Sequence, residues 1–158
     1  MTSDEVKAAP PGPSLKARAV ALLSRREYSR AELAKKLAPY AQDESELEQV
    51  LASLTDQGWQ SDERFVQGVL HRKSARQGTA LIVQSLRQQG VQAEFIEEAR
   101  EQLKQTEFER ARQVWEKRFA REGAPSDRQT YARQARFLAA RGFGADVINR
   151  LLRNPDTD

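Results

Sequence analysis

One short pattern recurs three times and sets the spacing of the whole chain. It consists of a leucine, three residues, a glycine, an apolar residue, two residues and an acid, and it occupies 54–62, 86–94 and 138–146. The glycine can adopt the left-handed conformation that ends a helix, and the acid lies where the next helix begins and favours negative charge. The pattern therefore predicts a joint between two helices, and its repetition predicts an array of related helical units.

Other start and stop signals divide the chain between the joints into nine amphipathic helices. Serine or threonine followed three residues later by glutamate or glutamine is a capping box, which occurs at Ser29, Thr106 and Ser126. Pro39, Gly78 and the 123–125 loop are expected to stop helices. The helices are predicted at about 14–26, 29–38, 43–57, 62–77, 79–89, 92–104, 106–121, 126–141 and 143–153.

The nine helices fall into three groups of three, which predicts an all-α fold of tandem three-helix repeats forming an elongated, curved solenoid. The repeats are expected at 14–60, 61–105 and 106–154. Only 7% of the residues are aromatic and no stretch alternates as a strand would, which excludes a sheet-based core. Residues 1–13 carry three prolines and are predicted to be a disordered tail, and residues 155–158 a short acidic one.

The residue types present argue against an enzyme and against a bound cofactor or metal. The chain has no cysteine and one histidine, His71, which is expected to have a surface or packing role; too few other ligands remain for a zinc site. Asp62 and Glu63 are adjacent on a helix and point about 100° apart, so their expected role is to charge its first turn. No phosphate-binding glycine loop, signal peptide or membrane span is visible, which predicts a cytoplasmic protein.

The two tryptophans are expected to pack in the core rather than to stack on bases. Trp59 occupies the joint position that Val91 and Phe143 occupy in the other two joints. Trp115 lies on the apolar stripe of the helix predicted at 106–121.

Charge alternates in blocks along the chain although the formal net charge is only +3. Residues 41–63 are acidic without a basic residue and 64–90 are basic without an acid, so the molecule is expected to have distinct basic and acidic sides. The basic side chains lie opposite the apolar stripes and form the candidate surface for a polyanion or an acidic protein. They are Arg25, Arg26, Arg30, Lys35, Lys36, Arg72, Lys73, Arg76, Arg110, Lys117, Arg121, Arg133 and Arg136.

Several phrases of the sequence resemble the bacterial RecX family over about residues 14–153. They are the Tyr-Ser-Arg-x-Glu-Leu run at 28–33, the Leu-x3-Gly-Trp-x2-Asp-Glu-Arg-Phe run at 54–65, Arg72-x5-Gly78 and Leu86-x3-Gly90-Val91. The resemblance implies a regulator of the RecA recombinase, built of three three-helix repeats, that binds the groove of the RecA–DNA filament. It implies inhibition of ATP hydrolysis, strand exchange or filament growth, in DNA repair, recombination and the SOS response, and brings no catalytic residue or cofactor.

The expected partner is therefore the RecA nucleoprotein filament, with direct binding to single- or double-stranded DNA left open and the protein itself a monomer. The main alternative is a winged-helix or helix-turn-helix DNA-binding protein, since residues 29–59 could form two helices and a turn. A wing would need a β-hairpin after Gly58, where the sequence predicts another helix. A third alternative is a helical scaffold for an acidic protein, which would not require assembled filaments.

Overall fold

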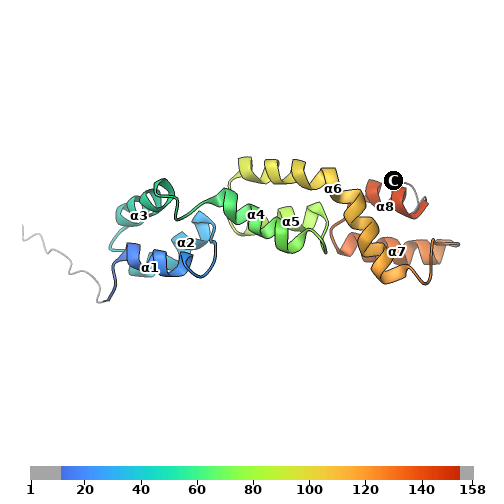
Figure 1. Ribbon diagram of the computed structural model, residues 1–158, viewed down its shortest axis with the longest axis horizontal. Coiled ribbons are helices and arrows are strands. Elements are labelled where there is room, and N and C mark those ends of the chain that lie inside the picture. The colour runs from blue at the N-terminus through green and yellow to red at the C-terminus, as the bar shows by residue number, and fades with distance from the viewer. Residues whose placement is uncertain (1–11, 154–158) are drawn as a thin grey trace, which may run out of the picture. The chain divides into compact units, whose positions relative to one another are not determined.

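The computed structural model describes residues 12–153, and every regular element in that range is helical (Figure 1). The α-helices are α1 (Leu15–Leu23), α2 (Arg30–Leu37), α3 (Glu44–Asp56), α4 (Asp62–Lys73), α5 (Thr79–Gln88), α6 (Ala93–Phe119), α7 (Arg128–Ala140) and α8 (Ala145–Arg153), with a 3₁₀ turn, η1 (Ala38–Tyr40), after α2. The all-α class is confirmed. The acidic tail and the N-terminal tail up to residue 11 lie outside the described residues.

The chain divides into two compact units, and the division falls within α4. Unit 1 ends at Phe65 and unit 2 begins at Val66. The predicted division into three groups of about fifty residues stays a prediction. A β-hairpin after Gly58, which the winged-helix alternative requires, is not present in the described range, because α4 starts at Asp62.

Unit 1 is a three-helix core whose ends form as the sequence predicts. Ser29 and Glu32 form the expected capping box: the Ser29 hydroxyl accepts from the Glu32 N–H at 3.1 Å, and the Glu32 carboxylate accepts from the Ser29 N–H at 3.1 Å. At the first joint Gly58 has φ +80°, and the N–H groups of Trp59 and Gln60 both donate to the Leu54 carbonyl. The core of this unit consists of Leu15, Ala19, Tyr28, Leu33, Leu37, Leu51 and Leu54.

Asp62 binds the start of α2 in addition to charging the first turn of α4. Its carboxylate accepts from the Arg30 N–H at 2.8 Å and from the Gln60 side-chain amide at 2.9 Å. The same amide nitrogen of Gln60, which is buried, donates to the Tyr28 carbonyl at 3.3 Å. The joint at 54–62 is therefore hydrogen-bonded to the loop before α2 and to the first residue of α2, which sequence spacing alone did not predict.

In unit 2 the predicted helices 92–104 and 106–121 are one continuous helix, α6, of 27 residues. The predicted capping box at Thr106 is wrong: the Thr106 hydroxyl donates to the Leu103 carbonyl, within the helix. No glycine or proline interrupts 93–119, so the backbone has no reason to stop at Thr106. The ribbon of α6 changes direction along its length, from the part that covers α5 to the part near α7 (Figure 1).

The loop between α4 and α5 and the third joint bring two glycines, Gly78 and Gly142, into close backbone contact. The Gly78 N–H donates to the Arg141 carbonyl at 2.7 Å, and the Ala80 N–H donates to the Gly142 carbonyl at 3.3 Å. A Cβ atom on Gly78 would lie 2.3 Å from the carbonyl carbon and oxygen of Gly142. Only a residue without a side chain fits here, so the loop between α4 and α5 is fixed to the turn between α7 and α8.

The C-terminal half of α6 forms a second core with α7 and α8. It contains Ala111, Val114, Trp115, Phe119, Leu138, Phe143, Ile148, Leu151 and Leu152. The Trp115 indole N–H donates to the Gln134 side-chain oxygen at 2.8 Å, and Gln134 donates in turn to the Gly123 carbonyl at 3.1 Å. Helix α7 is capped by Asp127, whose carboxylate accepts from the Thr130 N–H at 2.7 Å; the predicted cap at Ser126 is one residue too early.

Candidate nucleic-acid interface

The described residues contain no cluster of side chains suited to metal binding. Within residues 12–153 no three His, Cys, Asp or Glu side chains come together in a way that could hold a metal ion. His71 is exposed on α4, which agrees with a surface role. No helix in the described range combines the length and the apolar character that a membrane span needs. Charged and aromatic side chains on the surface are therefore the remaining candidates.

Arg110 does not belong to the basic surface, because it is buried. Only 8% of its surface is exposed, so the prediction that it faces solvent is wrong. Its guanidinium donates to the backbone carbonyls of Ser74 at 3.0 Å and Leu103 at 3.0 Å, and also to that of Gln77. Burial lowers the pKa of Arg110, and the nearby Glu107 carboxylate opposes that effect. Arg110 thus holds the loop that follows α4 against α6.

Four of the predicted cations are engaged by neighbours within their own unit. Arg30 is paired with Glu48 at 3.1 Å and Arg26 with Glu32 at 3.4 Å, while the Lys73 ammonium donates to the Ser85 hydroxyl at 3.1 Å. Arg133 forms an ion pair with Glu122. The other predicted surface cations are exposed and form no ion pair within the described residues: Arg25, Lys35, Lys36, Arg72, Arg76, Lys117, Arg121 and Arg136.

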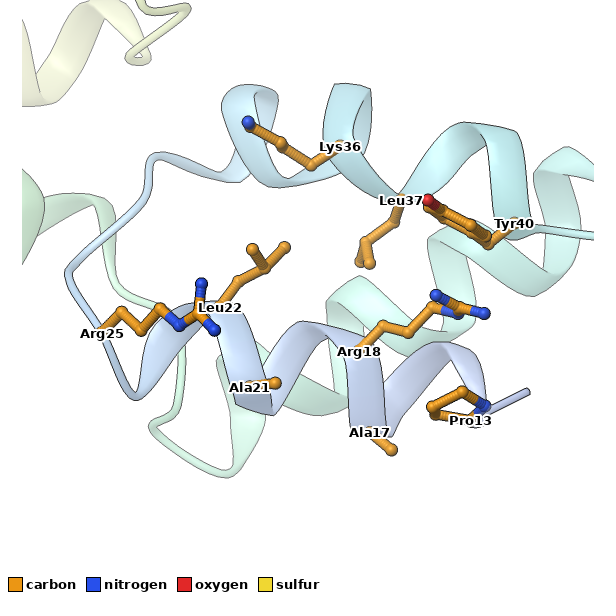
Figure 2. A pocket seen from close by; sticks show the side chains of 9 residues that line it. All are labelled: Pro13, Ala17, Arg18, Ala21, Leu22, Arg25, Lys36, Leu37 and Tyr40. Atoms are coloured by element: carbon orange, nitrogen blue, oxygen red, sulfur yellow. The ribbon is translucent and has the colours of Figure 1, made fainter.

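Two of these free cations lie in unit 1 at a hollow of about 360 Å³ between α1 and α2 (Figure 2). We call it the α1–α2 hollow. Leu22 from α1 and Leu37 from α2 extend into the space between the two helices, Arg25 lies at the end near Leu22, and Lys36 lies on α2 with its ammonium directed away from that space (Figure 2). At the other end the Arg18 guanidinium covers the Tyr40 ring at 3.9 Å. The lining residues are Pro13, Ala17, Arg18, Ala21, Leu22, Arg25, Lys36, Leu37 and Tyr40, so the hollow is apolar with cations at its edges.

A second hollow, in unit 2, is richer in positive charge. We call it the α6–α7 hollow; it measures about 290 Å³ and is lined by Arg76, Val114, Lys117, Arg118, Phe137 and Arg141. Arg118 and Arg141 lie near the Phe137 ring, with guanidinium carbons 5.7 and 4.9 Å from its centroid. Of the four cations, Arg76 and Lys117 were predicted as surface residues, whereas Arg118 and Arg141 were not.

The sequence places Arg118 and Arg141 beside residues of the predicted pattern, but it does not indicate that they belong to the basic surface. Arg118 follows Lys117 on α6, and Arg141 immediately precedes Gly142 of the third joint. The contacts of Gly78 with the Arg141 carbonyl and of Ala80 with the Gly142 carbonyl bring the loop after α4 beside the end of α7. Sequence periodicity within one helix cannot reveal a contact between loops more than sixty residues apart.

Trp59 and Trp115 differ in burial, although both were expected to pack in the core. Trp115 is buried, with 7% of its surface exposed, and confirms the expectation. Trp59 is 44% exposed in unit 1, so its expectation is wrong. Val91 and Phe143, at the corresponding joint positions, are buried. The joint pattern therefore specifies a backbone turn and does not specify burial of the apolar residue.

Comparison with known proteins points to one family. The sequence profile described as "RecX, third three-helix domain" matches residues 105–152. The chain is 47% identical over 143 residues to Regulatory protein RecX of Leptothrix cholodnii, covering 90% of both chains. It is 44% identical over 143 residues to Regulatory protein RecX of Ralstonia nicotianae, covering 90% of this chain and 89% of that one.

The fold has a counterpart among solved structures. The crystal structure of RecX from Lactobacillus salivarius superposes with a TM-score of 0.80 over 90% of this chain and 94% of that chain. The two sequences are 20% identical, so this likeness concerns the helical-repeat fold.

Proposed function

Because the chain belongs to the RecX family of regulatory proteins, we propose that it is a non-enzymatic regulator of the RecA recombinase. It binds the groove of the RecA–DNA filament and inhibits ATP hydrolysis, strand exchange and filament extension. Its setting is DNA repair, recombination and the SOS response in the cytoplasm, and it acts as a monomer.

The observation that carries this proposal, beyond family membership, is the distribution of unpaired cations over both units. The α1–α2 hollow and the α6–α7 hollow each gather exposed cations, and neither is lined by a carboxylate. Contacts that are individually weak add through effective concentration when one chain binds a repeating lattice. A filament that repeats the same protein and DNA surfaces suits such a chain, so a single deep pocket is not required.

RecA-catalysed ATP hydrolysis on single-stranded DNA is the decisive measurement. The protein is titrated from far below one molecule per RecA protomer, and suppression well below that ratio is the expected result, because a bound molecule also blocks filament growth. Hydrolysis unchanged up to equimolar protein would reject RecA regulation for this chain.

The contribution of the basic surface is tested on α4 and the loop after it. Reversing Arg72, Lys73 and Arg76 to glutamate should weaken inhibition while circular dichroism keeps the helical signal, because these side chains lie at or near the surface. The matched control reverses Lys104, Arg87 and Arg128, three exposed cations outside the predicted surface. Equal weakening by both triple variants would indicate a general effect of net charge and remove the assignment of this surface.

A further inference from the structure

We propose that the α6–α7 hollow is a binding site for the phosphodiester backbone of single-stranded DNA, in which Phe137 offers a ring edge to a neighbouring base. The inference deepens the proposed function and rests on it for the identity of the polyanion. It assigns a role to Arg118 and Arg141, which the basic surface predicted from sequence did not include.

The charge of the hollow is the first reason. Four cations, Arg76, Lys117, Arg118 and Arg141, line a space of about 290 Å³ without a carboxylate among the lining residues. None of the four forms an ion pair within residues 12–153, whereas several other exposed or partly exposed arginines there are paired with glutamate. Repulsion among four unpaired like charges is relieved by an anion, so the site is electrostatically suited to one.

The arginines and the apolar residues that line the hollow limit the kinds of anionic ligand that can bind there. Three of the four are arginines, whose planar guanidinium can donate two parallel hydrogen bonds to one phosphate. Val114 and Phe137 are the only apolar residues that line the hollow, and every other lining residue carries a positive charge, so the hydrophobic side chains of a peptide would find few apolar partners there. Bases of a single strand are free to contact an aromatic side chain such as Phe137 with an exposed surface, whereas bases of a duplex are already stacked on one another.

The backbone that carries these arginines is held in place before any ligand binds. The loop after α4, which carries Arg76, is fixed by the Arg110 guanidinium through the Ser74 and Gln77 carbonyls. The Gly78 N–H then donates to the carbonyl of Arg141 itself, at 2.7 Å. A site whose supporting backbone is already ordered loses less conformational entropy when a ligand binds. This favours binding of the phosphate at a defined position over a general attraction to the surface.

The test compares two double variants of the full-length protein that change the net charge equally. Arg118→Gln/Arg141→Gln alters the hollow, and Arg87→Gln/Arg128→Gln alters exposed arginines of unit 2 outside it. Binding to a fluorescent single-stranded oligonucleotide is followed by anisotropy over a range of salt concentrations, with circular dichroism to establish folding.

The hollow variant is expected to lose about 1.4 from the slope of log affinity against log salt, at about 0.7 per phosphate contact on a single strand. That loss corresponds to about 25-fold weaker binding at 0.1 M salt when both proteins bind equally at 1 M. The control variant should keep the wild-type slope. Equal losses in the two variants, or none in either, would overturn the proposal.

Three further measurements distinguish DNA binding in the hollow from a contact with an acidic protein, from the regulatory function as a whole and from the binding of free phosphate. If the hollow variant binds the oligonucleotide normally but no longer suppresses RecA-catalysed hydrolysis, the hollow contacts an acidic protein surface and the DNA assignment fails. If wild-type protein binds DNA through the hollow but leaves RecA unaffected, the regulatory function fails and the site stands. Inorganic phosphate at matched ionic strength should not displace the oligonucleotide; displacement would identify free phosphate as the ligand and overturn the assignment to DNA.

Discussion

The backbone N–H of Gly78 donates to the backbone carbonyl of Arg141 at 2.7 Å, which joins the loop after α4 to the end of α7. A hydrogen bond between main-chain groups does not depend on side-chain rotamers, and here Gly78, in the loop between α4 and α5, and Gly142, in the third joint, let the two segments approach. Because Arg141 lines the α6–α7 hollow and Gly78 follows the loop that carries Arg76, this contact sets the separation of two of its cations.

Replacing Gly78 with alanine should destabilise unit 2. The new Cβ would lie 2.3 Å from the Gly142 carbonyl, so the two loops must separate, at a cost of about 1–3 kcal/mol typical of an overpacked contact. Urea denaturation followed by circular dichroism measures the free energy of unfolding. Gly144→Ala is the control, because nothing lies within 4 Å of its added Cβ, and its cost should stay at or below about 1 kcal/mol. Equal stability of Gly78→Ala and wild type would contradict the close approach.

Replacing Arg110 with methionine should also destabilise the protein, by about 2–4 kcal/mol, since the Ser74, Gln77 and Leu103 carbonyls all lose a donor. Methionine keeps the unbranched stem, so the change chiefly removes the hydrogen bonds. The comparison is Arg112→Met, which removes surface ion pairs with Glu109 and Glu116. It should cost less than about 1 kcal/mol, and a similar cost for both variants would argue against a special role of Arg110.

Tryptophan fluorescence distinguishes the environments of Trp59 and Trp115. Trp115 is buried and hydrogen-bonded to Gln134, so the Trp59→Phe variant should emit at shorter wavelength and resist quenching by iodide. The Trp115→Phe variant, which keeps the exposed Trp59, should be quenched readily. Resistance to iodide in the Trp115→Phe variant equal to that of the Trp59→Phe variant would place Trp59 in a buried site in solution, where the joint pattern had predicted it.

The Asp127 cap of α7 should contribute free energy of unfolding that is lost when the solution is acidified. The Thr130 N–H, which donates to the carboxylate, holds the pKa of Asp127 below its usual value of 3.8. The charged form is favoured in the folded state, so the stabilisation is present above the unfolded pKa and is lost as pH falls through the folded pKa. NMR titration of the Asp127 carboxyl should give a midpoint below 3.8.

The comparison variant for this titration is Asp127→Asn, which can cap α7 without titrating. The stability advantage of wild type over this variant should shrink as the solution is acidified past that midpoint. A midpoint at or above the usual value, or an advantage independent of pH, would indicate that the cap does not form in solution.

Local signals in the sequence predicted most of the helices. Gly58 and Gly142 end helices with positive φ, and Ser29 and Glu32 form their capping box, because such features depend on a few neighbouring residues. Thr106 and Glu109 carry the same capping pattern and fail. With no glycine or proline nearby, the continuous helix is available, and packing on α5 and on α7 and α8 favours it.

The candidate site was predictable only in part, because it depends on contacts between distant loops. Helical periodicity placed Lys117 and Arg110 on one polar face of the predicted helix, and Lys117 is indeed exposed. Arg110 is buried instead, since the loop at 74–77 covers it and supplies carbonyl acceptors. A helical wheel represents one helix in water, and it contains no information about which other segment will lie against that helix.

The continuity of α6 also limits how the chain can change in evolution. A loop between repeats accepts an inserted residue easily, since the repeats on either side keep their packing. An insertion inside α6 would instead turn everything after it by about 100° and advance it by about 1.5 Å. Such a change would break the Gly78–Arg141 contact and separate the four cations of the α6–α7 hollow. We therefore expect the segment from Ala93 to Phe119 to accept substitutions but to keep its length.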